Sequence, residues 1–235
     1  MTPLKEKFIL YPHASWFFAL AMLITWVGFS TTYFARLGAS TVYHHVHGAT
    51  AGLWILLLIV QPLLYKYGKL KLHRKLGWIA SVILIPLLVV GGLKMIQLMI
   101  QRQDFYPPGE VYRLSFIDFY SLIQFLLFFG LSLYHGKRIH LHARYMVCTV
   151  LTLLPPAITR LLFFIPFLDT FTKTLNVSFA GVEITSLILI WDDKRSGDFR
   201  RPYFLALAVF GLLHLLMNFA GSWVLWKSLM DVYAS

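Results

Sequence analysis

Residues 43–65 read YHHVHGATAGLWILLLIVQPLLY, and this stretch decides the class of the protein. Beyond its three histidines, His44, His45 and His47, no residue of the stretch carries a charge. An apolar segment of this length approaches the roughly 20 residues that a helix needs to cross a bilayer at about 1.5 Å per residue. Because polar side chains are costly to place in lipid, histidines at its entrance indicate either hydrogen-bond partners or a ligand.

The composition of the whole chain also indicates a membrane protein. Of its 235 residues 58% are hydrophobic and 13% are charged, whereas soluble domains carry about 25% charge. The length accommodates one membrane bundle and no soluble domain, so residues 1–235 are predicted to form a single transmembrane domain. The lone Cys148 lies in an apolar run, which excludes a disulfide framework within one chain.

Further apolar runs predict an all-α integral membrane bundle of about seven transmembrane helices. The predicted spans are Ser15–Tyr33, Ala49–Tyr65, Leu76–Ile100, Phe116–Tyr134, Tyr145–Phe167, Val177–Trp191 and Tyr203–Trp226. Glu183 interrupts the sixth of these.

The net charge of +11 is explained by topology rather than by nucleic acid. Most cations lie in short connections that fall on one side of a seven-span chain, where they also suit anionic lipid headgroups. These are Lys5, Lys7, Lys66, Lys69, Lys71, Arg74, Lys75, Lys137, Arg138, Arg144, Lys194, Arg195, Arg200 and Arg201. The positive-inside rule then predicts a cytoplasmic N terminus and a C terminus outside, with the lipid bilayer as the partner and no nucleic acid.

Short motifs follow one another along nearly the whole chain. They are HVHG at His45–Gly48, W-x6-Q-P-L-L at Trp54–Leu64, L-H-R-K-L-G at Leu72–Gly77, H-A-R-Y-M at His142–Met146 and P-P-A-I-T-R at Pro155–Arg160. In this order they resemble an uncharacterised family of bacterial multi-pass inner-membrane proteins. Glu183 aligns with the family's acidic span, which tends to carry Asp, and Asp192 and Asp193 with an Asp-containing cytoplasmic loop. The resemblance implies a fold and an inner-membrane location, and no established activity.

The three histidines of the opening stretch allow two arrangements. His44 and His47 share one face if the helix begins before them, whereas His45 and His47 share a side if the chain is still extended. Interfacial histidines that bond to loops or headgroups are the competing explanation.

The predicted last span carries a polar stripe. His214, Asn218 and Ser222 follow one another at intervals of four residues. His214 lies about 12 residues into the span, which is about 18 Å along the axis. The stripe is either a hydrogen bond between helices or a ligand-facing surface.

A charge in the predicted fifth span needs an acceptor. Arg160 follows Pro155 and Pro156, which are expected to kink or break the helix. Glu183 is the preferred partner, and Asp118 is the alternative. These groups, together with the histidines, predict a polar site in the outer half of the membrane.

The cytoplasmic side has histidines of its own. His73 and His142 immediately precede or begin predicted spans among Lys and Arg. Helix capping and headgroup binding explain such residues, and an inner site in which the two rings approach each other is the alternative.

Two functional hypotheses follow for the outer-half site. In the first it holds a metal ion, with His44, His45, His47 and His214 as ligands, or a haem, which would need facing histidines such as His47 and His214. In the second it binds or transports a small ligand or lipid through the helix break and the ligand-binding set of Arg160, Glu183, Asn218 and Asp118.

A membrane enzyme with acid–base histidines and a scaffold without chemistry rank lower. The chain has no nucleophile elbow, HExxH helix or phosphate loop.

Overall fold

The computed structural model describes residues 12–197 and 199–235, and this part of the chain is all-α, as predicted. Lys5 and Lys7 lie outside the described residues. The helices are α1 (Ala14–Gly28), η1 (Phe34–Ala39), α2 (Val42–Lys66), α3 (Leu70–Ile79), η2 (Ala80–Leu84), α4 (Ile85–Gln101), η3 (Gln103–Phe105), α5 (Glu110–Tyr134), α6 (Ile139–Leu162), α7 (Phe171–Arg195), α8 (Arg201–Ala220) and α9 (Val224–Ala234).

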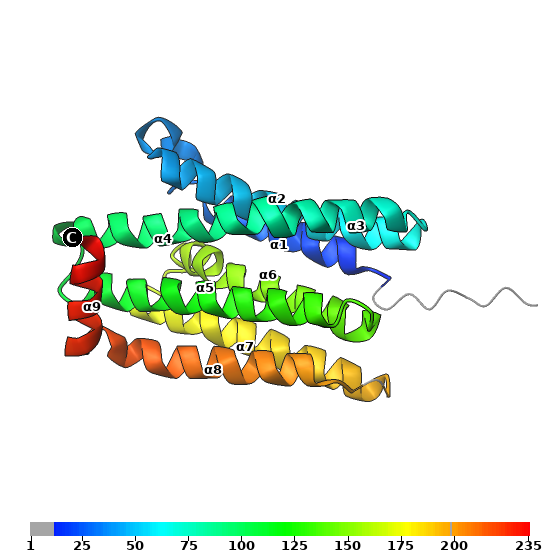
Figure 1. The fold of residues 1–235 in the computed structure, drawn as a ribbon. Helices are drawn as coiled ribbons and strands as arrows, with labels where there is room; N and C mark the ends of the chain where they lie inside the picture. Colours follow the sequence, from blue (N-terminus) through cyan, green and yellow to red (C-terminus); the bar gives the residue numbers. More distant parts are fainter. Residues whose placement is uncertain (1–11, 198) are drawn as a thin grey trace, which may run out of the picture.

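The long helices lie side by side in one bundle (Figure 1). Six helical segments within the described residues are long and apolar enough to cross a membrane: α2, the continuous run α3–η2–α4, α5, α6, α7 and α8. The first predicted span is shorter than expected, because α1 has 15 residues and ends at Gly28. The multi-pass character predicted from the sequence is confirmed, with α1 as a seventh, shorter apolar helix.

The connections gather at two opposite ends of the bundle (Figure 1). Residues 67–69, 135–138, 196–197 and 199–200 lie between helices at one end, which we call the basic end because most of the cations listed above lie there. Residues 29–41, 102–109 and 163–170 lie at the other end together with α9, and we call it the α9 end.

The predicted seventh span is too long. Helix α8 ends at Ala220, and after a short turn α9 runs across the end of the bundle (Figure 1). The indole Nε1 of Trp226 donates to the Tyr112 carbonyl oxygen at 2.9 Å and so fixes α9 on α5. Ser222 lies in the turn and donates to its own chain at Phe219, so it does not extend the stripe of α8.

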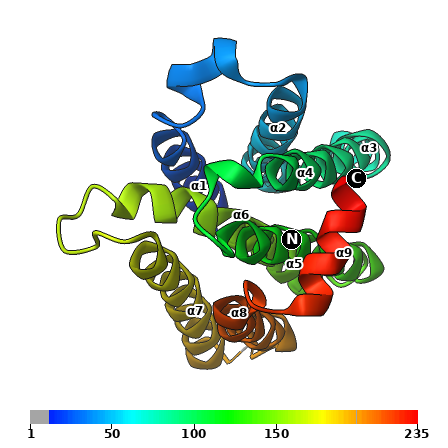
Figure 2. The same cartoon turned by 90° about the vertical axis from the view of Figure 1, so that its left-hand side faces the viewer.

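Two clusters of the apolar core lie on either side of α5 and α6, and a third, smaller one joins α4 and α5 to α9. One cluster joins α5 and α6 to α7 and α8 around Phe128, Phe179 and Phe210. The other joins them to α1, α2 and α4 around Trp54 and Phe125. Figure 2 shows α6 between these two groups of helices. Side chains of α2 and α8 therefore face different parts of the bundle.

The prolines of α6 do not break it. The helix is continuous from Ile139 to Leu162 through Pro155 and Pro156, contrary to the predicted break. Prolines are tolerated in membrane helices where neighbouring groups use the freed carbonyls. The carbonyls that Pro155 and Pro156 leave without an N–H donor belong to Leu151 and Thr152, one turn earlier. Arg160 Nη1 donates to a different carbonyl, that of Pro156, at 2.7 Å.

Arg144 lies in α6 and not in a solvated connection. Its Nε and Nη2 donate to the two carboxylate oxygens of Asp193 in α7, each at 2.7 Å, and both side chains are 2% exposed. Asp193, expected in a cytoplasmic loop, is likewise buried in a helix. This bidentate pair joins α6 to α7 near the basic end, so Arg144 is not one of the exposed cations there.

Candidate functional site

A large cavity of about 640 Å³ lies among α1, α2, α4, α5 and α6 and reaches the connections of the α9 end. Four of the side chains predicted for the outer-half site line it: His44, His47, Asp118 and Arg160. The structure therefore brings together half of the predicted residues from three helices, α2, α5 and α6. Its volume falls within the range of about 300–1,000 Å³ that is usual for small-molecule sites.

His47 is held on one wall by a close approach of α2 and α4. Its Nδ1 lies 3.3 Å from the Leu88 carbonyl oxygen and donates to it, which leaves Nε2 as an acceptor. A Cβ on Gly91 would lie 3.2 Å from the Cβ of His47, so glycine is needed there for the approach. Helix α2 already begins at Val42, so the helical arrangement of His44 and His47 is the one formed.

Arg160 is fixed at the opposite wall by three contacts. Besides the bond to Pro156, its Nε donates to the Thr32 hydroxyl at 3.2 Å, and its guanidinium centre lies 4.4 Å from the Phe29 ring centre. Its Nη2 donates no hydrogen bond to any described residue. The Nη2 group of this guanidinium is thus free to donate a hydrogen bond towards the cavity.

Asp118 is the second charged group on this cavity, and it has no short-range partner. Its carboxylate makes no hydrogen bond, and no ion pair within 4.0 Å, with the described residues. It interacts with Arg160 only at longer range. Because an ionisable group inside a membrane is costly, an unpaired carboxylate there points to solvent or a ligand.

The rim of the cavity lies in the connection between α4 and α5. Arg102 adds a second cation, and Tyr106 adds a hydroxyl. Burial raises the pKa of Tyr106 above its usual value, so the phenol stays protonated and can donate near neutral pH. Sequence reasoning missed both residues because they follow a predicted span rather than lie in one; the isolated cation on the sparsely charged side was the available signal.

Three more of the predicted residues, Glu183, His214 and Asn218, belong to a separate network between α7 and α8. His214 Nδ1 lies 2.8 Å from Glu183 Oε1, and its Nε2 lies 3.0 Å from Asn176 Oδ1. Asn218 bonds to the same Asn176 oxygen at 3.2 Å and accepts from Arg113 Nη2 at 3.2 Å. These side chains satisfy one another across α5, α7 and α8. Asn176 and Arg113 were not predicted.

Two expected pairings are therefore not formed. Glu183 contacts His214, and Arg160 contacts Thr32 and Pro156, so the preferred Arg160–Glu183 pair is absent among the described contacts. His47 and His214 do not line a common cavity, because they belong to the two halves of the bundle.

The four predicted metal ligands are dispersed. His44 Nδ1 bonds to the Thr41 hydroxyl at 2.7 Å, and His45 Nδ1 bonds to the Tyr33 hydroxyl at 2.9 Å. Within residues 12–197 and 199–235 no three His, Cys, Asp or Glu side chains are grouped so that they could hold a metal ion. The sequence pattern placed three histidines together in the chain, but the helix directs them to different neighbours.

The two histidines predicted to lie on the cytoplasmic side, His73 and His142, do approach each other. The ring centres of His73 and His142 lie 6.3 Å apart, and both residues line a smaller cavity of about 110 Å³ at the basic end. The sequence offered, as an alternative to helix capping, an inner site in which His73 and His142 approach each other. The structure brings these two rings together.

Comparison with known proteins adds no further assignment. No family model, no curated protein and no solved structure matches the chain. The features that bear on function are therefore the two cavities and the side chains that line them.

Proposed function

We propose that the protein binds a small amphipathic molecule in the large cavity at the α9 end, with the polar group of that molecule between Arg160 and Asp118. The observation that carries the proposal is that these two charged side chains line one cavity and leave hydrogen-bonding capacity unused towards it. An ionisable group within a membrane helix is costly unless it has a partner, so unused capacity of this kind favours a polar ligand.

The chemistry of the walls defines the class of ligand. Arg160 and Arg102 favour an anionic or strongly accepting group, and Asp118 favours a hydrogen-bond donor. Aromatic and aliphatic side chains such as Trp26, Phe125 and Leu98 suit an apolar body. A lipid headgroup and a free amphiphile share this chemistry.

Small-ligand binding is supported better than the outer-half metal site. His44, His45 and His214 bond to different neighbours, so of the predicted metal ligands only His44 and His47 line this cavity. Imidazole nitrogens suit hydrogen bonding to an organic ligand.

Replacing Arg160 with alanine is expected to reduce the occupancy of co-purified ligand by about 10- to 100-fold, because a hydrogen bond to a charged group contributes about 1.5–3 kcal/mol. Native mass spectrometry of protein released from bacterial membranes measures occupancy. Organic extraction separates a lipid from a polar small molecule.

The matched control is Arg36→Ala, which removes an exposed cation at the same end. We expect Asp118→Asn to weaken binding and Arg36→Ala to leave it unchanged. Equal occupancy in the wild type, R160A and R36A proteins would remove the main support for the proposal.

We also propose the bacterial inner membrane as the location, with the basic end in the cytoplasm beside anionic headgroups, and the α9 end and the C terminus outside. Cys148 is fully buried, so single introduced cysteines can be labelled against a low background. In intact spheroplasts a membrane-impermeant maleimide is expected to label Ser40→Cys, and to label Lys69→Cys only after permeabilisation. The reverse pattern would overturn this orientation.

A further inference from the structure

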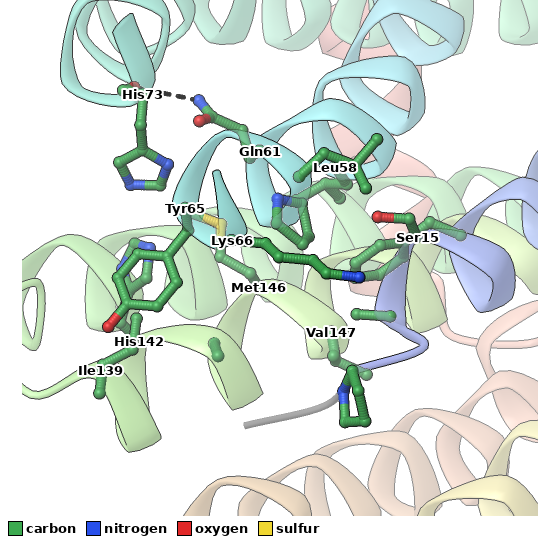
Figure 3. A pocket seen from close by; sticks show the side chains of 16 residues that line it. Ser15, Leu58, Gln61, Tyr65, Lys66, His73, Ile139, His142, Met146 and Val147 are labelled. Carbon is green, nitrogen blue, oxygen red and sulfur yellow. Dashed lines mark hydrogen bonds between the residues drawn. The ribbon is translucent and has the colours of Figure 1, made fainter. Parts of the chain in front are cut away.

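Two histidines from different helices face each other at the basic end. His73 extends from α3, and His142 lies on α6; their ring planes are inclined by 70°. Figure 3 shows the imidazole of His73 pointing towards the side on which His142 and Tyr65 lie. This pair lies in a different cavity from the proposed ligand site, so the inference below is independent of that proposal.

The hydrogen bonds of the two rings leave nitrogen lone pairs unused. His142 Nδ1 donates to the Ser132 carbonyl oxygen at 2.9 Å, which leaves its Nε2 as a lone-pair donor to a metal. The buried Nδ1 of His73 has no hydrogen-bond partner, although the main chain of Gln61 lies close to the ring. Metal-binding histidines commonly show this arrangement, with the second ring nitrogen turned to a main-chain carbonyl.

A third unused atom lies beside the pair. Gln61 donates through Nε2 to the His73 carbonyl oxygen at 3.2 Å, while its buried Oε1 has no partner. Three residues on one small cavity thus have polar atoms available for a bound group. Solvent-shielded atoms without partners are costly, so a ligand here would relieve several penalties together.

The distance between the rings suits one metal held between them. A metal–imidazole bond is about 2.0–2.1 Å long, and a ring nitrogen lies about 1.2 Å from the centre of its ring, so two rings on opposite sides of one metal have centres about 6.4 Å apart. The observed separation is 6.3 Å. Coordination leaves rotation about each metal–nitrogen bond free, so the 70° inclination is compatible with it.

We propose that His73 and His142 coordinate a single transition-metal centre from opposite sides. No third His, Cys, Asp or Glu of the described residues stands with them, so other ligands must fill the remaining positions. The cavity of about 110 Å³ has room for an ion and its water ligands but not for a macrocycle. Around a bare ion, Gln61 Oε1 and water complete the coordination.

The walls of this cavity suit such a group next to the membrane. Phe18, Leu58 and Met146 provide apolar contacts, and Lys66 provides a cation at the edge. The hydrophobic shell limits the access of water to the metal.

The wild-type protein tests the proposal without any substitution. Protein purified from cells grown in medium supplemented with transition metals is expected to contain about one metal ion per chain by elemental analysis. A Co²⁺-substituted sample is expected to show nitrogen-ligand d–d bands. Protein without stoichiometric metal and without uptake of equimolar Co²⁺ would overturn the proposal.

Variants assign the ligands. His73→Ala and His142→Ala are each expected to lower metal content to less than one tenth, whereas His13→Ala, which removes an exposed histidine at the start of α1, retains it. Added imidazole is expected to restore the spectrum of a folded His→Ala variant. Gln61→Leu is also expected to lower the metal content, because it removes the amide oxygen that completes the coordination. Full metal content in both His73→Ala and His142→Ala would disprove coordination by this pair.

Discussion

Arg144→Ala is expected to lower the free energy of unfolding by about 3–5 kcal/mol, because it leaves the buried carboxylate of Asp193 without its bidentate partner. The two charges lie in adjacent helices and are almost fully excluded from solvent. Thermal and chemical unfolding in detergent, followed by circular dichroism, measures the loss.

A paired substitution separates the ion pair from general packing. The double variant Arg144→Met/Asp193→Leu removes both charges and is expected to recover most of the lost stability, since apolar replacements of buried pairs are often neutral or better. Lys137→Ala removes an exposed cation at the same end and is expected to change little. A double variant as unstable as R144A would show that the pair's charges are not the cause.

Gly28→Ala is expected to destabilise the bundle by up to about 3 kcal/mol, although alanine is the better helix former. A Cβ at Gly28 would lie 2.5 Å from the carbonyl oxygen of Ala157, a main-chain atom that cannot turn aside. Helix α1 must then move away from α6 and uncover Phe18, which is 6% exposed.

The matched control, Gly181→Ala, is expected to change the stability in the opposite direction. Gly181 lies within α7, and nothing would lie within 4 Å of a Cβ there. Gly181→Ala is therefore expected to stabilise by about 0.5–1 kcal/mol. If both substitutions destabilise equally in the same unfolding assay, the close approach of α1 and α6 is not the limiting contact.

Hydropathy was enough to predict the helices because a membrane span is a local property of the sequence. The runs around Trp54 and Phe128 were placed correctly since length and lack of charge decide them. The end of α8 was misplaced because the turn at Gly221 lies inside an unbroken apolar run that includes Trp226. The resemblance to a bacterial membrane-protein family stays a prediction.

The partners of polar groups could not be predicted in the same way. Helical spacing tells which residues share a face, but not which helix that face meets. His214 faces α7 and His47 faces α4 because the core divides at α5 and α6, and this division has no local sequence signal. The same limit explains why Arg160 was matched with Glu183, although Asp118 is the carboxylate that shares its cavity.

Helix α9 runs across the bundle axis and exposes Val224, Leu225 and Val232, each at least 75% exposed, beside polar residues such as Lys227. Short amphipathic helices of this kind typically lie at the boundary between headgroups and acyl chains. We therefore expect α9 to fix the depth of the bundle in the bilayer and to keep the neighbouring residues Arg102 and Tyr106 near the headgroups. A ligand of the proposed cavity would then reach the same entrance from water and from within the leaflet.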